Sequence, residues 1–152
     1  NQRSGAEFSY SFFLWVNQQS FSSSAGLLHI FHKGHPLYYP LMGPGVFLHS
    51  EINTLRVYMN STATWNNYVD VPNIPIKKWV HIVITATSND PTKPGLNVYQ
   101  NGQVVHKEES SWLPQNNYTT KNYIGKSNWT NVTSPYENAD ELFKGRIFDF
   151  RG

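Results

Sequence analysis

Alternation of apolar and polar residues is the main structural signal in this chain. It is clearest at residues 79–87, WVHIVITAT. Val80, Ile82 and Ile84 occupy alternate positions there. A period of two indicates a strand with one buried face, because successive side chains point to opposite sides. We predict a central strand here, with these three residues lining a core and His81 facing away from it.

A second signal is the Asn-Gly pair at residues 101–102, which separates two alternating runs at 96–100 and 103–107. Both central residues of a type I′ turn need positive φ, and Asn followed by Gly adopts that conformation most readily. The pattern predicts a β-hairpin. We expect its apolar residues to pack against the central strand: Leu96, Val98, Val104 and Val105.

Shorter apolar or aromatic runs predict the remaining strands, at residues 9–17, 26–33, 46–50, 54–60, 69–71, 122–126 and 143–151. Two prolines and two glycines assign residues 37–45 to a loop. Roughly ten short strands without a convincing helix are the pattern of a β-sandwich or barrel. The length of 152 residues fits a single domain over 1–152. Because the chain starts at Asn1 and ends in a strand, we expect it to be processed or excised from a longer polypeptide.

Composition removes several classes of function. Cysteine is absent, which excludes disulfides and thiolate metal sites. The net charge is +2, only 14% of residues are charged, and no basic stripe is present, so a nucleic-acid partner is not expected. No apolar run reaches the length of a membrane span. The oligomeric state is left open by the sequence.

The order of segments resembles the laminin-G-like, concanavalin-A-like lectin/glucanase superfamily. The most specific pieces are IPIKKWVHIVI (residues 74–84), LNVYQNGQVV (96–105) and the closing FKGRIFDF (143–150). The resemblance covers nearly the whole chain. It implies an all-β fold, a two-sheet antiparallel jelly-roll sandwich, with the last strand entering at Gly145 beside the first. It also implies that Trp15 and Trp79 pack in the core.

The same resemblance bears on metal binding, since members of the superfamily often carry one calcium ion. Calcium is held by carboxylate and carbonyl oxygens. The resemblance makes Asp149, in the closing strand, the candidate ligand for one structural calcium ion, with Asp70 and Asp140 as weaker candidates. A solvated or hydrogen-bonded carboxylate is the alternative interpretation of each. No other cofactor is expected.

Catalysis is not expected from this sequence. Retaining glucanases of the superfamily carry clustered carboxylates on one strand, and hydrolysis needs an acid and a nucleophile about 5–5.5 Å apart. The ten acidic residues do not form that pattern, and Glu108 and Glu109 are neighbours that would point to opposite faces. Glycoside hydrolase and polysaccharide lyase activities remain the less favoured alternatives. A three-histidine metal site is not expected either, because His29 and His32 are predicted to lie on opposite faces of their strand.

Tryptophans in predicted loops are the candidate binding residues. Trp65, Trp112 and Trp129 are each flanked by hydrogen-bonding residues. An aromatic ring covers the C–H face of a pyranose, while amides bind its hydroxyl groups. The candidate ligand-binding residues are Trp65, Asn66, Tyr68, Trp112, Tyr118, Asn128 and Trp129. The same rings are equally suited to anchor a protein partner, or to fold back onto the edge of the sandwich.

Four Asn-x-Ser/Thr sequons fall in or beside predicted loops, where a glycan can be accommodated. Their acceptors are Asn60, Asn117, Asn128 and Asn131. They favour an extracellular, secreted, virion-surface or cell-surface setting. The sequence therefore predicts a non-catalytic, lectin-like carbohydrate-binding domain whose partner is a glycan. The alternative is a structural or adhesive module that binds a surface protein.

Overall fold

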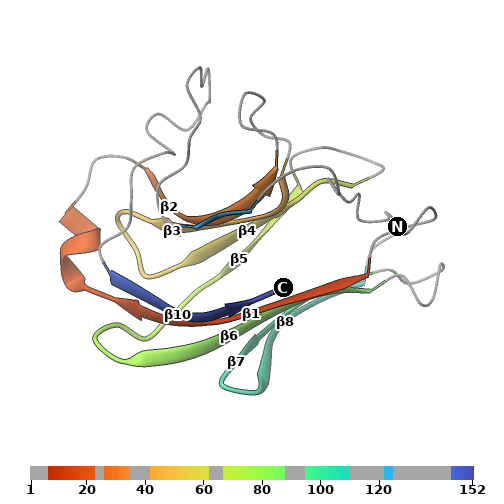
Figure 1. The fold of residues 1–152 in the computed structure, drawn as a ribbon. Coiled ribbons are helices and arrows are strands. Elements are labelled where there is room, and N and C mark those ends of the chain that lie inside the picture. Colours follow the sequence, from red (N-terminus) through yellow and green to blue (C-terminus); the bar gives the residue numbers. More distant parts are fainter. Residues whose placement is uncertain are drawn as a thin grey trace.

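The computed structural model describes residues 7–22, 26–34, 42–61, 67–87, 95–109, 122–124 and 145–152. Within them, two five-stranded antiparallel sheets stack face to face (Figure 1). The strand order of the first sheet is β10-β1-β6-β7-β8, and that of the second sheet is β5-β4-β3-β2-β9. The predicted two-sheet jelly roll is confirmed.

The first sheet consists of β1 (Phe8–Val16), β6 (Trp79–Thr87), β7 (Gly95–Gln100), β8 (Gln103–Glu109) and β10 (Gly145–Arg151). The second sheet consists of β2 (Leu27–Gly34), β3 (Met42–His49), β4 (Leu55–Met59), β5 (Asn67–Val71) and β9 (Asn122–Ile124). A short 3₁₀ helix, η1 (Gln18–Ser22), follows β1. Among the described residues, no helix is long and apolar enough to cross a membrane.

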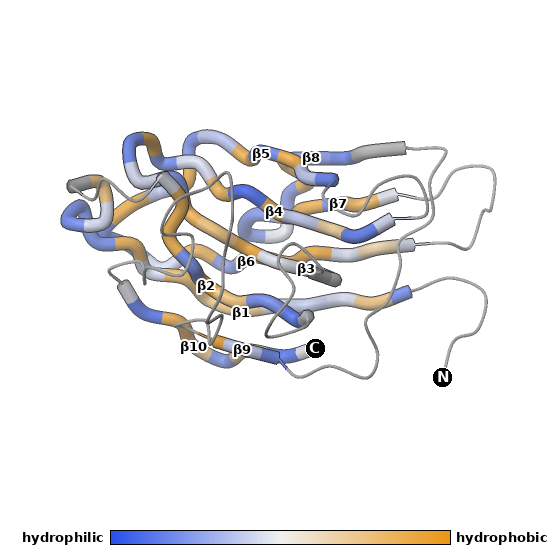
Figure 2. Tube along the Cα trace, turned by 90° about the horizontal axis from the view of Figure 1, so that it is seen from above, coloured by the Kyte–Doolittle hydropathy of each residue, from blue (hydrophilic) through white to orange (hydrophobic). Residues whose placement is uncertain are grey.

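The core lies between the sheets and follows the alternation of the strands. β6 occupies the centre of the first sheet and buries Val80, Ile82 and Ile84, as predicted. Orange, hydrophobic stretches run along strands of both sheets, and blue stretches lie mainly at turns and strand ends (Figure 2). The second sheet contributes apolar residues from three neighbouring strands: Leu28, Ile30, Val46, Leu48, Val57 and Met59.

The predicted hairpin is confirmed, with φ of 50° at Asn101 and 81° at Gly102. The Asn101 side-chain oxygen accepts a hydrogen bond from the His81 amide at 2.9 Å, and the Asn101 amide donates to the His81 carbonyl at 2.8 Å. These two bonds fix the turn against β6.

Half of the predicted hairpin core is wrong. Leu96 and Val98 are buried, but Val104 and Val105 are 52% and 42% exposed. The register shifts between Val98 and Tyr99, so that Tyr99 pairs with Val104. Val104 therefore shares the outer face with Tyr99. The shift places one more residue on β8 than on β7, and this extra residue is Val105, which would otherwise pair with the buried Val98.

The other strands agree with their predicted positions apart from their ends. β3 begins at Met42, inside the predicted loop, and Pro44 follows Gly43 through a cis peptide bond. β10 pairs with β1, with Gly145 opposite Val16, so the closing strand enters beside the first strand as expected.

Candidate functional site

Four polar or aromatic residues gather on the outer face of the second sheet. They are His49 on β3, Arg56 on β4, and Tyr68 and Asp70 on β5, and we call them the Tyr68 cluster. Antiparallel pairing sets Arg56 opposite Asp70. Side chains two residues apart share one face of a strand, so Tyr68 and Asp70 lie side by side.

Arg56 holds the cluster together. Its Nε donates to Asp70 Oδ1 at 2.8 Å, and its Nη2 donates to Asp70 Oδ2 at 2.9 Å. The same guanidinium stacks on Tyr68, with Cζ 4.0 Å from the ring centroid. A bidentate pair fixes the plane of the guanidinium, and a cation over an aromatic face is itself attractive. The Tyr68 ring is therefore held in one orientation.

Burial and charge set the protonation states in the cluster. Burial alone would raise the pKa of Asp70, but the hydrogen bonds and charge of Arg56, with a smaller effect of His49, lower it overall. Hydrogen bonding to Asp70 raises the pKa of Arg56. Burial, and then the charge of Arg56, lower the pKa of His49. At neutral pH the cluster holds one positive and one negative charge, and His49 is uncharged.

Solvent reaches part of this cluster. Tyr68 is 48% exposed, and the Asp70 side chain is 37% exposed. The Arg56 side chain is only 10% exposed, so it supports the other two from beneath. An exposed ring beside an ionised carboxylate can cover the apolar face of a sugar and accept hydrogen bonds from its hydroxyl groups.

Two histidines lie on β2 of the same sheet, and their positions correct the sequence prediction. His29 and His32 on β2 are both fully buried, with 2.8 Å between His29 Nε2 and His32 Nδ1. They were expected on opposite faces of the strand. A register shift between His29 and Phe31 reverses the alternation and brings both rings to one side. No group of three or more metal-ligating side chains forms within the described residues.

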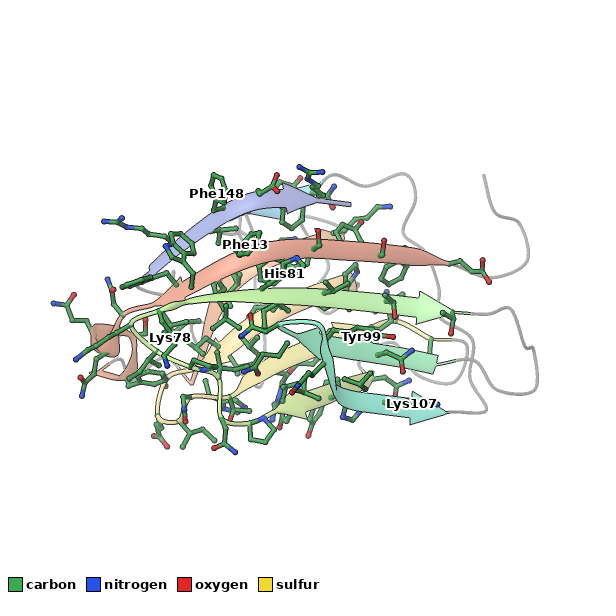
Figure 3. All side chains as sticks on the ribbon, turned by 90° about the horizontal axis from the view of Figure 1, so that it is seen from below. Phe13, Lys78, His81, Tyr99, Lys107 and Phe148 are labelled. Carbon is green, nitrogen blue, oxygen red and sulfur yellow. The ribbon has the colours of Figure 1, made fainter. Side chains whose placement is uncertain are left out.

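Aromatic side chains cover part of the outer face of the first sheet, and here the core prediction for Trp15 and Trp79 is wrong. Trp79 is 44% exposed and Trp15 is half-buried. The two are register partners, with ring centroids 5.7 Å apart. In the neighbouring row, Phe13 stacks on His81 at 4.6 Å and contacts Phe148 (Figure 3). These five residues form the aromatic strip.

Besides Asp70, a weaker calcium candidate, the structure describes three of the predicted site residues, while Asp140 lies outside the described residues. Tyr68 is exposed, as a binding residue requires. Asp149 accepts a hydrogen bond from Arg151 Nε at 3.0 Å, so an arginine is its partner here. Asn60 is only 3% exposed, and its glycosylation stays a prediction. The others lie outside the described residues: Trp65, Asn66, Trp112, Asn117, Tyr118, Asn128, Trp129 and Asn131.

Sequence reasoning missed Arg56 and His49 as site residues and treated Asp70 only as a weak calcium candidate. The signal was available in the spacing, since Arg56 and Tyr58 alternate on one strand while Tyr68 and Asp70 alternate on the next. The prediction placed the binding residues in loops, whereas these residues lie on the outer face of a sheet.

Comparisons with known proteins agree with this fold. The profile of the family described as "Concanavalin A-like lectin/glucanases superfamily" matches residues 2–151. Among curated proteins, no sequence matches this chain. Solved structures at 16% identity or less show the shared fold alone.

Three of those structures illustrate the likeness. The heptameric SAP-like pentraxin of Limulus polyphemus has a TM-score of 0.56 at 16% identity, and the match covers 97% of this chain and 63% of the pentraxin. The CBM40 of the Ruminococcus gnavus IT-sialidase has a TM-score of 0.53 at 8% identity, covering 95% and 73%. A sialidase has a TM-score of 0.51 at 14% identity, covering 98% and 13%.

Proposed function

We propose a non-catalytic, carbohydrate-binding function for this chain, which belongs to the concanavalin A-like lectin/glucanase superfamily. The superfamily includes enzymes as well as binding modules, so the fold does not decide between them. One observation carries the proposal, namely the exposed Tyr68 ring held by Arg56 beside the Asp70 carboxylate.

The chemistry of the cluster suits a neutral glycan. Its two charges cancel, so it offers hydrogen-bond acceptors and an aromatic surface without a net charge. Because Arg56 already fixes Asp70 and Tyr68, a sugar would meet side chains that need little reordering, and this lowers the entropic cost of binding. Asp70 is committed to a bidentate pair with Arg56, an arrangement that favours recognition over acid–base catalysis.

The first test is a glycan array probed with the folded domain, with and without EDTA. We expect saturable binding to one class of neutral glycan. Loss of that binding in EDTA would support the predicted calcium ion, which remains a prediction. A blank array with folded protein would contradict the proposal and favour the alternative, a structural or adhesive domain that binds a surface protein.

Substitutions at Tyr68 then locate the binding site. We expect Tyr68→Ala to weaken glycan binding about tenfold or more, because an exposed aromatic anchor commonly contributes more than 1 kcal/mol. Tyr68→Phe keeps the ring and its contact with Arg56, so it should bind within about threefold of the unchanged protein. Titration calorimetry measures both.

The matched control is Tyr99→Ala, on the outer face of the opposite sheet. It removes a ring of the same kind from β7 and should leave glycan binding unchanged. Equal loss in Tyr68→Ala and Tyr99→Ala would show a general loss of folding and would overturn the assignment to the Tyr68 cluster. Thermal melting of each variant separates the two causes.

The remaining predictions belong to the same proposal. An extracellular, secreted or surface location fits a domain that binds glycans. The loop residues Trp65, Asn66, Trp112, Tyr118, Asn128 and Trp129 are proposed to contribute further contacts. Glycosylation at Asn60, Asn117, Asn128 and Asn131 is a prediction that mass spectrometry of protein secreted from a glycosylating host would test.

A further inference from the structure

A shallow, wide-open surface cavity of about 390 Å³ lies at one end of the first sheet. It is lined by Asn17, Gln18, Gln19 and Lys77. Its volume lies within the range of about 300–1,000 Å³ that is usual for small-molecule sites. The lining offers three amide groups and one ammonium, and none of the four residues is acidic.

The cavity lies where β1 ends and β6 begins. The Lys77 amide donates to the Val16 carbonyl at 2.9 Å, which ties the segment before β6 to the end of β1. All four lining residues are exposed, so a ligand in solution can reach them.

The aromatic strip ends beside this cavity, although none of its five residues lines it. Trp15 Nε1 donates to Asn17 Oδ1 at 3.0 Å, so a wall residue of the cavity is fixed to the strip. Trp79, the register partner of Trp15, is 44% exposed. A ligand would reach this edge-to-face pair of tryptophans only by extending from the cavity past Asn17.

Three cationic side chains lie at or near the cavity. Besides Lys77, Lys78 is exposed and lies next in the chain, at the start of β6 (Figure 3). Arg146, the register partner of Trp15 on β10, is exposed as well. An anionic ligand would pair with Lys77, which lines the cavity, whereas the exposed Lys78 and Arg146 lie outside the lining and add only weak, solvent-screened attraction. The Tyr68 cluster has no net charge to offer.

We propose that this cavity is a second saccharide site, which binds a carboxylated pyranose at the end of a glycan. The Lys77 ammonium binds the carboxylate, the Asn17 and Gln18 amides bind hydroxyl groups, and the Trp15–Trp79 pair contacts the C–H face of the ring where the ligand extends past Asn17. The site goes beyond the proposed function, because it uses another sheet and another ligand charge.

Methyl glycosides are the probes for this site, in the Tyr68→Ala background so that the first site does not contribute. Binding is followed by calorimetry and by the NMR shifts of the Asn17, Gln18 and Gln19 amides. We expect the glycoside of glucuronic acid, of N-acetylneuraminic acid, or both to bind, which identifies the source of the carboxylate. Methyl glucoside, which is neutral, should bind at least about tenfold more weakly than its uronate counterpart.

Lys77→Asn is the decisive variant. Lys77 has a φ of 56°, and Asn tolerates that left-handed conformation better than most residues, so the fold should survive. We expect Lys77→Asn to weaken binding of the acidic sugar about tenfold or more, because hydrogen bonds to charged groups are the strong ones. Lys78→Asn is the matched control, since it removes an adjacent charge outside the cavity lining, and it should change affinity by less than about threefold.

Trp79→Ala should also weaken binding, and its melting temperature shows whether the fold is intact. No shift of the three amides with either acidic sugar would overturn the proposal, as would equal losses in Lys77→Asn and Lys78→Asn. Failure of the Tyr68 site leaves this result unaffected, because the experiment is carried out without Tyr68.

Discussion

The two sheets of this sandwich present different outer faces. On the second sheet, Phe47 and Tyr58 lie outside the inter-sheet core and are nonetheless 0% and 1% exposed. On the first sheet, Phe148 and Trp79 are 64% and 44% exposed. Among the described residues, the outer face of the second sheet is thus buried at Phe47 and Tyr58 and open at Tyr68 and Asp70. The first sheet keeps one buried face and one open aromatic face.

Buried and exposed aromatic rings have different roles in the two sheets. An apolar ring that is already buried contributes to folding and is not available to a partner. An exposed ring contributes little to folding, and its contact surface remains free for a ligand. Residue type alone does not tell the two apart, because both outer faces are rich in aromatic residues.

The largest expected effect compares one phenylalanine from each outer face. Phe47→Ala should lower the free energy of unfolding by about 3–5 kcal/mol, because it empties a fully buried site. Phe148→Ala should change it by less than about 1 kcal/mol, because 64% of that side chain already faces solvent. Urea denaturation of both variants measures the two losses. Similar losses would contradict the contrast between the faces.

Most of the fold could be predicted from the sequence because strand alternation is a local property. β6 and the hairpin of β7 and β8 were located within one or two residues. The error at Trp79 is instructive, because it lies an odd number of positions from Val80, Ile82 and Ile84. Alternation places it on the outer face with His81. The family resemblance favoured the core, and that interpretation was wrong.

The second expected effect is a loss of stability in acid that originates on the second sheet. Burial, and secondly the charge of His32, lower the pKa of His29 to about 3, and burial lowers the pKa of His32 to about 4. In the unfolded chain both imidazoles take up protons near pH 6.5, while the folded protein does so only near pH 4 and below. Falling pH therefore favours the unfolded state between these values.

Each imidazole should contribute about 1.4 kcal/mol of lost stability per pH unit in that window. The pair gives roughly 2–3 kcal/mol per unit between pH 6 and 5. Urea denaturation at a series of pH values measures the slope. His32→Gln removes one of the two groups and should reduce the slope by about half. An unchanged slope in this variant would show that other groups cause the acid sensitivity.

The candidate site was less predictable than the fold, for two physical reasons. Register shifts are set by tertiary pairing and leave little trace in the local sequence. The shift between His29 and Phe31 brought two histidines together, and the one between Val98 and Tyr99 took Val105 out of pairing with Val98. The Tyr68 cluster depends on cross-strand pairing of β4 with β5, which becomes known only when the strand order is known.

The smallest expected effect tests inner and outer positions within a single hairpin. Val98→Thr introduces a hydroxyl at a position that is 0% exposed, and should cost about 1–2 kcal/mol. Val104→Thr makes the same change where 52% of the side chain is exposed, and should stay within about 0.5 kcal/mol. Thermal melting distinguishes the two, because the chemical change is identical. Equal losses would place Val104 in the core after all, and its pairing with the outward-facing Tyr99 would then be wrong. A difference of the expected size would establish that β8 turns an apolar side chain toward the same open face as Tyr99, so that this face extends to the edge of the first sheet.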